Sequence, residues 1–89
     1  MSLFEWDQEK NKANKLKHGI SFEDTLPVFH DEYALTIEDT HHEEQRWKTL
    51  GTGKYLMVVV VVFSHRKKIR IISARKATKT ERRKYEGRR

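Results

Sequence analysis

The sequence predicts an α+β domain in which helices pack on an antiparallel β-sheet. Residues 34–38 follow a period of two, residues 44–50 alternate charged with uncharged side chains, and residues 68–76 divide into two faces as a last strand. A run of valines at 58–62 adds a central strand, because β-branched side chains favour strands over helices. Helix start and stop signals flank the other segments. The expected order is β-α-α-β-β-β-β-α, in one domain spanning residues 1–89.

The N-terminal segment predicts a short strand at residues 3–6, followed by a helix between Asp7 and Gly19. Aspartate is a favoured N-cap, and glycine commonly ends helices because it tolerates a left-handed backbone. Ala13 and Leu16 are expected to form the thin apolar stripe by which this helix packs.

A second helix is predicted to begin at Ser21, with Asp24 three residues later as in a capping box. Pro27 lies too deep for a first-turn proline and should kink or shorten this helix. The residues expected to share its buried face are Phe22, Leu26 and Phe29.

Four more strands and a last helix complete the prediction. The strands are expected at Ala34–Glu38, Glu44–Leu50, Tyr55–Phe63 and Lys68–Lys76. In the last strand, strict alternation points Arg75 to one face and Arg70 and Lys76 to the other. The final helix starts at the capping box formed by Thr78 and Glu81 and runs to about Tyr85.

The charge of the chain is unevenly distributed. Its net charge is +6, but residues 66–89 hold 12 basic against 2 acidic residues, a balance of +10. Such a segment suits a polyanion, most often nucleic acid, although it could equally be a solvated tail. No cysteine is present, which excludes disulfides and a thiol nucleophile. The segment Met1–Asp7 lacks a targeting pattern, and a cytoplasmic location is expected.

Arginines on the predicted sheet are the strongest chemical signal. Arg46 lies on one strand, and Arg70 and Arg75 lie on the last, with Lys48 and Lys76 nearby. A guanidinium can donate two parallel hydrogen bonds to phosphate and keeps its charge near neutral pH. The cluster therefore predicts RNA backbone binding or stabilisation of a phosphorane-like transition state, unless it is simply a solvated sheet face.

Trp47, between Arg46 and Lys48, is a candidate for stacking on an RNA base. In a domain this small, a tryptophan on a strand more often belongs to the core. Strand alternation also points Trp47 away from its two basic neighbours, which would exclude it from their site.

Proton transfer has three candidates: His18 at the end of the first helix, Glu44 and Tyr85. RNA cleavage without a metal ion needs little beyond such a proton-transfer group and the arginines, because the 2′-hydroxyl of the RNA can attack the adjacent phosphate. The motif His41-His42-Glu43-Glu44 has some metal-ligand character, but adjacent residues rarely converge on one ion. We therefore expect no metal site and no cofactor.

Short motifs along nearly the whole chain together resemble the BrnT toxin family, formerly called DUF497. The N-terminal motifs are Phe4-Glu5-Trp6-Asp7, Asn11-Lys12, Asn14 and Lys17-His18-Gly19-Ile20-Ser21-Phe22-Glu23-Asp24. The later motifs are Glu44-x-Arg46-Trp47, Ile69-Arg70-Ile71-Ile72-Ser73-Ala74-Arg75-Lys76-Ala77-Thr78 and Glu81-Arg82-Arg83-x-Tyr85-Glu86. Pro27 departs from the family pattern, which puts the regularity of the second helix in doubt.

The resemblance implies a RelE-like ribonuclease fold and the toxin half of a bacterial type II toxin–antitoxin pair. Such a toxin cleaves RNA and blocks translation. The implied partner is a BrnA-type ribbon-helix-helix antitoxin, in a heterotetramer that binds operator DNA through the antitoxin. Family motifs fall on Lys17-His18-Gly19, Glu44, Arg46, Trp47, Arg70 and Arg75.

Two other functions remain open at this point. The same basic segment would serve a nucleic-acid-binding module without catalysis, such as a corepressor. It would also serve a plain interaction partner whose basic end meets an acidic peptide.

Overall fold

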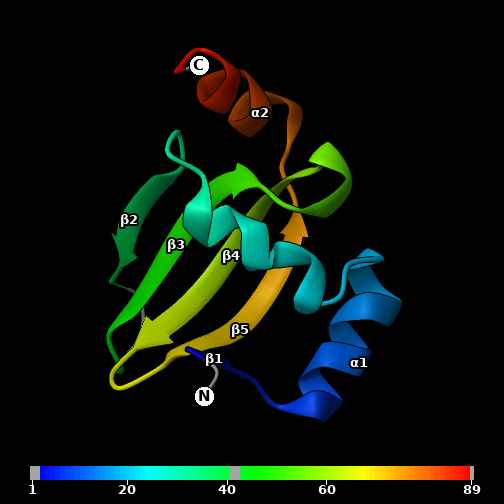
Figure 1. Ribbon diagram of the computed structural model, residues 1–89, viewed down its shortest axis with the longest axis vertical. Coiled ribbons are helices and arrows are strands. Elements are labelled where there is room, and N and C mark those ends of the chain that lie inside the picture. Colours follow the sequence, from blue (N-terminus) through cyan, green and yellow to red (C-terminus); the bar gives the residue numbers. More distant parts are fainter. Residues whose placement is uncertain (1–2, 41–42, 89) are drawn as a thin grey trace.

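The computed structural model describes residues 3–40 and 43–88 of the chain (Figure 1). The strands are β1 (Phe4–Glu5), β2 (Leu35–Asp39), β3 (Arg46–Thr52), β4 (Val58–His65) and β5 (Ile69–Lys76). The helices are α1 (Gln8–His18), η1 (Glu23–His30), η2 (Lys54–Leu56) and α2 (Lys79–Glu86), of which η1 and η2 are 3₁₀ helices. The predicted α+β class and the order of the five strands are confirmed.

The sheet has the strand order β1-β5-β4-β3-β2. Strands β2 to β5 form the predicted antiparallel meander, in which each strand pairs with the next along the chain. The short β1 differs, because it pairs with β5 in parallel through Phe4↔Ile69 and Glu5↔Arg70. It thereby returns the N-terminus to the end of the sheet where β5 begins.

The core lies between η1 and one face of the sheet. In Figure 1, η1 crosses in front of β3 and β4, and α1 lies beside β5. The Phe29 ring of η1 packs between the rings of Phe4 and Phe63, with both centroid distances at 5.1 Å. The buried core residues are Ile20, Phe22, Val28, Val59, Val61, Ile71 and Ala74. We call the face of the sheet opposite η1 the open face.

Helix α1 does not pack by its predicted apolar stripe. Ala13 is exposed and Leu16 is 89% exposed, whereas Asn11 and Asn14 are buried. Asn14 donates to the carbonyls of Ile20 (2.9 Å) and Ala74 (2.8 Å) and accepts from the backbone N–H of Ala74 (3.1 Å). The two Ala74 groups belong to β5 and lie beyond the residues of this strand that pair with the short β1, Ile69 and Arg70. The helix is therefore held by amides that satisfy a strand edge, a contact that an apolar stripe cannot make.

The predicted distortion at Pro27 is confirmed, because the segment forms a 3₁₀ helix. Ser21 Oγ accepts from the backbone N–H of Asp24 at 3.3 Å, as half of the expected box. Phe22 is fully buried, and the Leu26 and Phe29 side chains pack on the core as predicted.

The valine strand starts three residues later than predicted. Tyr55 and Leu56 have positive φ angles of 60° and 58° and belong to the turn of η2. The prediction placed these two residues in the strand because their side chains are apolar. It was wrong because both adopt a left-handed backbone, which costs about 1–2 kcal/mol for a residue with a Cβ atom and is therefore not expected from the sequence. Both side chains are exposed.

A β-bulge in β5 overturns the predicted facing of its arginines. Val62 pairs with Ser73, but Phe63 pairs with Ile71, so Ile72 is an extra residue. The bulge shifts the alternation by one, which turns both Ile71 and Ala74 into the core. Arg70 and Arg75 therefore share the open face rather than lying on opposite faces.

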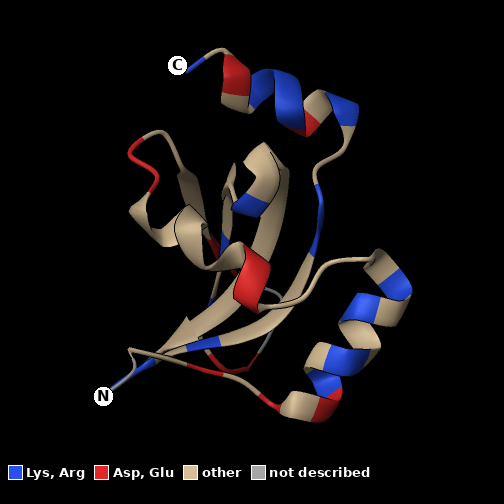
Figure 2. Cartoon of the chain, turned by 45° about the vertical axis from the view of Figure 1, so that its right-hand side comes forward, with Lys and Arg blue, Asp and Glu red and all other residues tan. Residues whose placement is uncertain are grey.

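Helix α2 begins with the predicted capping box, in which the Thr78 hydroxyl accepts from Glu81 N and Glu81 accepts from Thr78 N. Its buried side chain is Tyr85, which is 2% exposed. Figure 2 shows the blue of Lys and Arg along α2, interrupted by red and tan segments. No helix in the described parts of the chain is long and apolar enough to cross a membrane.

Candidate functional site

A row of charged and polar residues crosses the open face where β4 ends and β5 begins. Arg70 pairs in register with Ser64 on one side and Glu5 on the other. On β3, Arg46 pairs with Asp39, and its neighbour Trp47 pairs with Phe63, which places Arg46 beside Ser64. We call Asp39, Arg46, Ser64, Arg70 and Glu5 the arginine row. Strands lie about 4.8 Å apart, so the backbones of Arg46 and Arg70 are about 10 Å apart.

Arg70 holds an ion pair that a phosphate could replace. Its Nη1 lies 3.0 Å from Glu5 Oε2, with side chains 47% and 43% exposed. Exposed pairs of this kind contribute little, because water already solvates both charges. Glu5 therefore holds the Arg70 side chain near the surface, and a phosphate can take the place of Glu5 as the partner of the guanidinium.

Arg75 is engaged much more firmly, and in a structural role. Its Nη1 and Nη2 donate to the two carboxylate oxygens of Glu81 at 2.7 and 3.0 Å. The hydrogen bond from Arg75 lowers the pKa of Glu81 to about 2, with smaller contributions from Thr78, against the effect of burial. The same bond raises the pKa of Arg75. Because this pair fixes the first turn of α2 to β5, a phosphate would have to displace a bidentate partner.

A hollow of about 510 Å³ adjoins the arginine row. It is lined by Glu5, Glu44, Ser64, Arg66, Lys67, Lys68 and Arg70. The structure thus brings Glu44 together with Arg70, as a shared site requires. It also adds Ser64 and the three cations at 66–68, which the sequence indicated only as a turn.

His18 lies at a different place on the open face. It lines a smaller hollow of about 130 Å³ together with Lys48, Val62, Ser73 and Arg75. Arg75 pairs with Val60 and Arg70 with Ser64, four residues apart on β4, which is about 14 Å along the strand. Glu44 and His18 therefore belong to separate hollows.

Trp47 and Lys76 do not join the arginines. Trp47 pairs with Phe63 on the face that η1 covers, which confirms that it points away from Arg46 and Lys48. Lys76 ends β5 and lines a third hollow, beside α2. Of the metal-like motif, His41 and His42 lie outside the described residues.

The fold and this site define a small α+β protein whose open sheet face carries basic side chains suited to phosphate. A family model described as "Ribonuclease toxin, BrnT, of type II toxin-antitoxin system" matches residues 6–81. The chain therefore belongs to the BrnT family of ribonuclease toxins, and this family implies a cognate antitoxin.

A solved structure supports the same assignment. The chain is similar to the Brucella abortus ribonuclease toxin BrnT, known from a crystal structure at 1.1 Å resolution. The TM-score is 0.63 and the sequence identity is 25%, over 83% of this chain and 94% of that one. A search of curated proteins gave no match.

Proposed function

We propose that this protein is an endoribonuclease that cleaves RNA without a metal ion and thereby inhibits translation. The observation that carries the proposal is the arginine row. Arg70 and Arg46 flank Ser64 on the open face, and the ion pair of Arg70 is exposed and exchangeable. The scissile phosphate replaces Glu5 as the partner of Arg70, and Arg46 supplies a second positive charge beside it.

The proposed chemistry uses the RNA's own nucleophile. Glu44 takes the proton of the 2′-hydroxyl, O2′ forms a bond to phosphorus, and the bond from phosphorus to O5′ breaks. Water then protonates O5′ and Glu44 returns its proton to solvent. Glu44 is chosen over His18 because it shares the hollow with Arg70. Lys48 and His18 contact the RNA strand farther along the face, whereas Arg75 acts mainly through α2.

The proposed assembly is a cytoplasmic heterotetramer with a ribbon-helix-helix antitoxin of the BrnA type, bound to operator DNA through that antitoxin. Membership of a type II toxin family supports the existence of the partner. Light scattering on the co-purified complex measures the stoichiometry, and a mass other than two toxins with two antitoxins contradicts it.

The deciding experiment compares cleavage of RNA by free wild type, Arg70→Ala and Arg83→Ala, all in EDTA. Both substitutions remove one guanidinium, but Arg83 is exposed on α2 and lies outside the arginine row. We expect wild type to cleave, Arg70→Ala to be slower by about 100-fold or more, and Arg83→Ala to stay within about twofold. Glu44→Gln should slow cleavage by about 100-fold while RNA affinity is kept.

Intact RNA and undisturbed translation with folded wild type would falsify the proposal. Restoration of activity by Mg²⁺ after EDTA would contradict the metal-independent chemistry. Salt-sensitive RNA binding without cleavage, and without growth arrest on expression, would favour a non-catalytic nucleic-acid-binding or corepressor module.

A further inference from the structure

The turn between β3 and β4 presents two large apolar side chains to solvent. Tyr55 is 76% exposed and Leu56 is 88% exposed. Both residues have a left-handed backbone, which bulky side chains rarely adopt, and the Nζ of Lys54 lies 5.3 Å from the centre of the Tyr55 ring. We call Tyr55 and Leu56 the apolar tip. Strained residues of this kind often mark sites of function.

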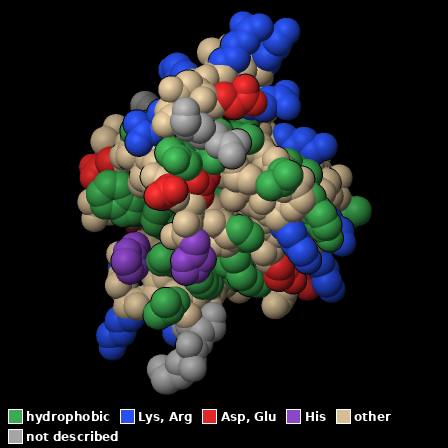
Figure 3. All heavy atoms as spheres, turned by 45° about the horizontal axis from the view of Figure 1, so that its top comes forward, with side chains coloured by type: hydrophobic (Ala, Val, Ile, Leu, Met, Phe, Trp, Pro, Cys, Tyr) green, Lys and Arg blue, Asp and Glu red, His purple; other side chains and the backbone are tan. Residues whose placement is uncertain are grey.

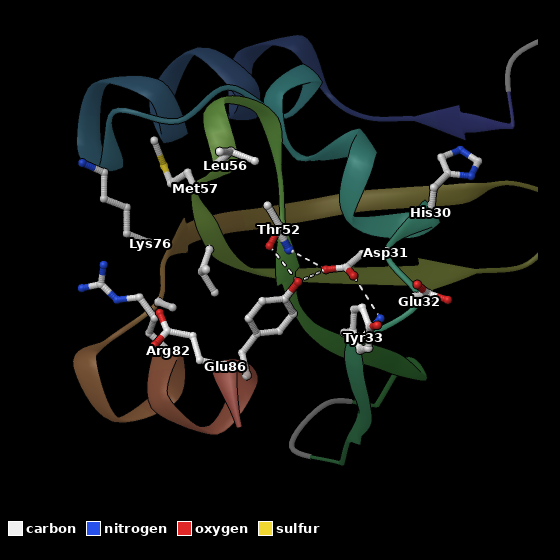
Figure 4. A pocket seen from close by; sticks show the side chains of 13 residues that line it. His30, Asp31, Glu32, Tyr33, Thr52, Leu56, Met57, Lys76, Arg82 and Glu86 are labelled. Atoms are coloured by element: carbon white, nitrogen blue, oxygen red, sulfur yellow. Dashed lines mark hydrogen bonds between the residues drawn. The ribbon is translucent and has the colours of Figure 1, made fainter. Parts of the chain in front are cut away.

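A hollow of about 690 Å³ lies beside this tip. Leu56 and Met57 line one wall, and Lys76 and Arg82 lie together at one end, with Asp31 and Glu32 toward the other (Figure 4). Lys54 lies against the Tyr55 ring, and Lys76 and Arg82 line the hollow together with Leu56. Glu86, one turn after Arg82 on α2, also lines this hollow. This end of the hollow therefore suits a negatively charged group next to an apolar one.

The wall of the hollow is firmly held. The Tyr85 hydroxyl donates to Asp31 Oδ2 at 2.5 Å and accepts from the Thr52 hydroxyl at 2.8 Å. Asp31 also accepts from the backbone N–H groups of Thr52 (2.9 Å) and Tyr33 (3.0 Å). These bonds join α2, β3 and the segment after η1, so the hollow exists before any partner binds.

We propose that the apolar tip and the cationic end of this hollow are the docking surface for the cognate antitoxin. The occupant is an acidic segment of the antitoxin that covers Leu56 and places a carboxylate between Lys76 and Arg82. The inference rests on the toxin's having a protein partner, which its family implies. A protein fits better than RNA, because an exposed leucine finds an apolar counterpart on a protein, whereas RNA offers mainly phosphates here. Figure 3 shows hydrophobic side chains reaching the surface beside those of Lys and Arg.

Two matched pairs of variants test this surface against the cognate antitoxin, with the dissociation constant measured by calorimetry. Leu56→Ser is paired with Leu16→Ser, since Leu16 is equally exposed, at 89%, on α1. Arg82→Glu is paired with Arg83→Glu, since the two are neighbours on α2 but only Arg82 lines the hollow. We expect Leu56→Ser and Arg82→Glu each to weaken binding at least tenfold, and both controls to stay within twofold.

Unchanged binding by Leu56→Ser overturns the proposal, as does failure of the wild type to bind. A larger loss with Ile37→Ser, which is exposed on the open face at 61%, would place the antitoxin on the sheet instead. Loss of RNA affinity by Leu56→Ser with antitoxin binding kept would make the tip an RNA site. Cleavage by the free variants is measured separately, so failure of the ribonuclease mechanism cannot be mistaken for failure of the docking surface.

Discussion

Arg70 and Arg75 are close in sequence and identical in chemistry, yet their surroundings give them different roles. Arg70 meets a single exposed carboxylate at 3.0 Å, a weak and exchangeable partner. Arg75 is held by both oxygens of Glu81 and so joins α2 to the sheet. We therefore assign phosphate contact to Arg70 and positioning of α2 to Arg75. Replacing Arg75 should reduce stability as well as any RNA contact.

The ionisation of Glu81 should make the free energy of unfolding depend on pH. Its folded-state pKa of about 2 lies below its ordinary value of 4.5, so its contribution is complete above about pH 5 and is lost as the pH falls towards 2. We expect Glu81→Gln to lower the free energy of unfolding by about 1–2 kcal/mol at pH 7, a value reduced for solvent screening. The gap between wild type and variant should close by about pH 2, as measured by urea unfolding at several pH values.

Glu86→Gln on the same helix is the control, because Glu86 is exposed and is not part of the capping box. If the difference in free energy of unfolding between wild type and Glu81→Gln stays constant from pH 7 to pH 2, the ion pair with Arg75 contributes nothing to stability.

At the scale of elements, α1 shows how a polar helix can be docked without an apolar stripe. Asn14 bonds to both backbone groups of Ala74, and Asn11 accepts from the backbone N–H of Phe22 at 2.8 Å. The asparagines thus connect α1 to the edge of β5 and to the segment before η1. Both residues belong to the N-terminal family motifs, but the sequence alone does not show that they bind the backbone of β5 and of the segment before η1.

Asn14→Ala should be strongly destabilising. It leaves the buried N–H and C=O of Ala74 and the carbonyl of Ile20 without these partners, at a cost of about 2–4 kcal/mol. Leu16→Ala, a larger loss of apolar surface in the same helix, should change the free energy of unfolding by less than about 0.5 kcal/mol, because Leu16 is exposed. Equal effects of the two substitutions in denaturant titrations would contradict this account.

At the scale of the whole molecule, the basic residues of the chain divide into separate surfaces. The arginine row and the cations at 66–68 lie at one end of the sheet, and the cations of α2 lie at the other (Figures 1 and 2). The +10 balance of residues 66–89 is therefore not one binding tail. We assign one end to RNA and the other to the antitoxin.

Salt dependence can separate these two surfaces. Each phosphate contact releases a bound counterion, so the slope of log affinity against log salt should fall in magnitude by about 1 for Arg70→Ala with single-stranded RNA. Arg83→Ala removes the same charge from the other end and should leave the slope unchanged. The slopes are measured by fluorescence anisotropy on a slowly cleaved variant, Glu44→Gln, and equal slope changes would indicate nonspecific attraction by net charge.

The sequence by itself determined the α+β class, the strand order along the chain, the caps of α1 and α2 and the distortion at Pro27, because these depend on local periodicity and on single residues. Motifs spread along the chain also indicated the family. Only the tertiary structure decided which arginines share a face, since a single bulge at Ile72 reverses every side chain after it. It likewise decided that Arg75 is bound by Glu81, that Glu44 rather than His18 lies beside Arg70, and that Tyr55 and Leu56 leave the strand. These outcomes depend on contacts between distant segments, which a local pattern cannot encode.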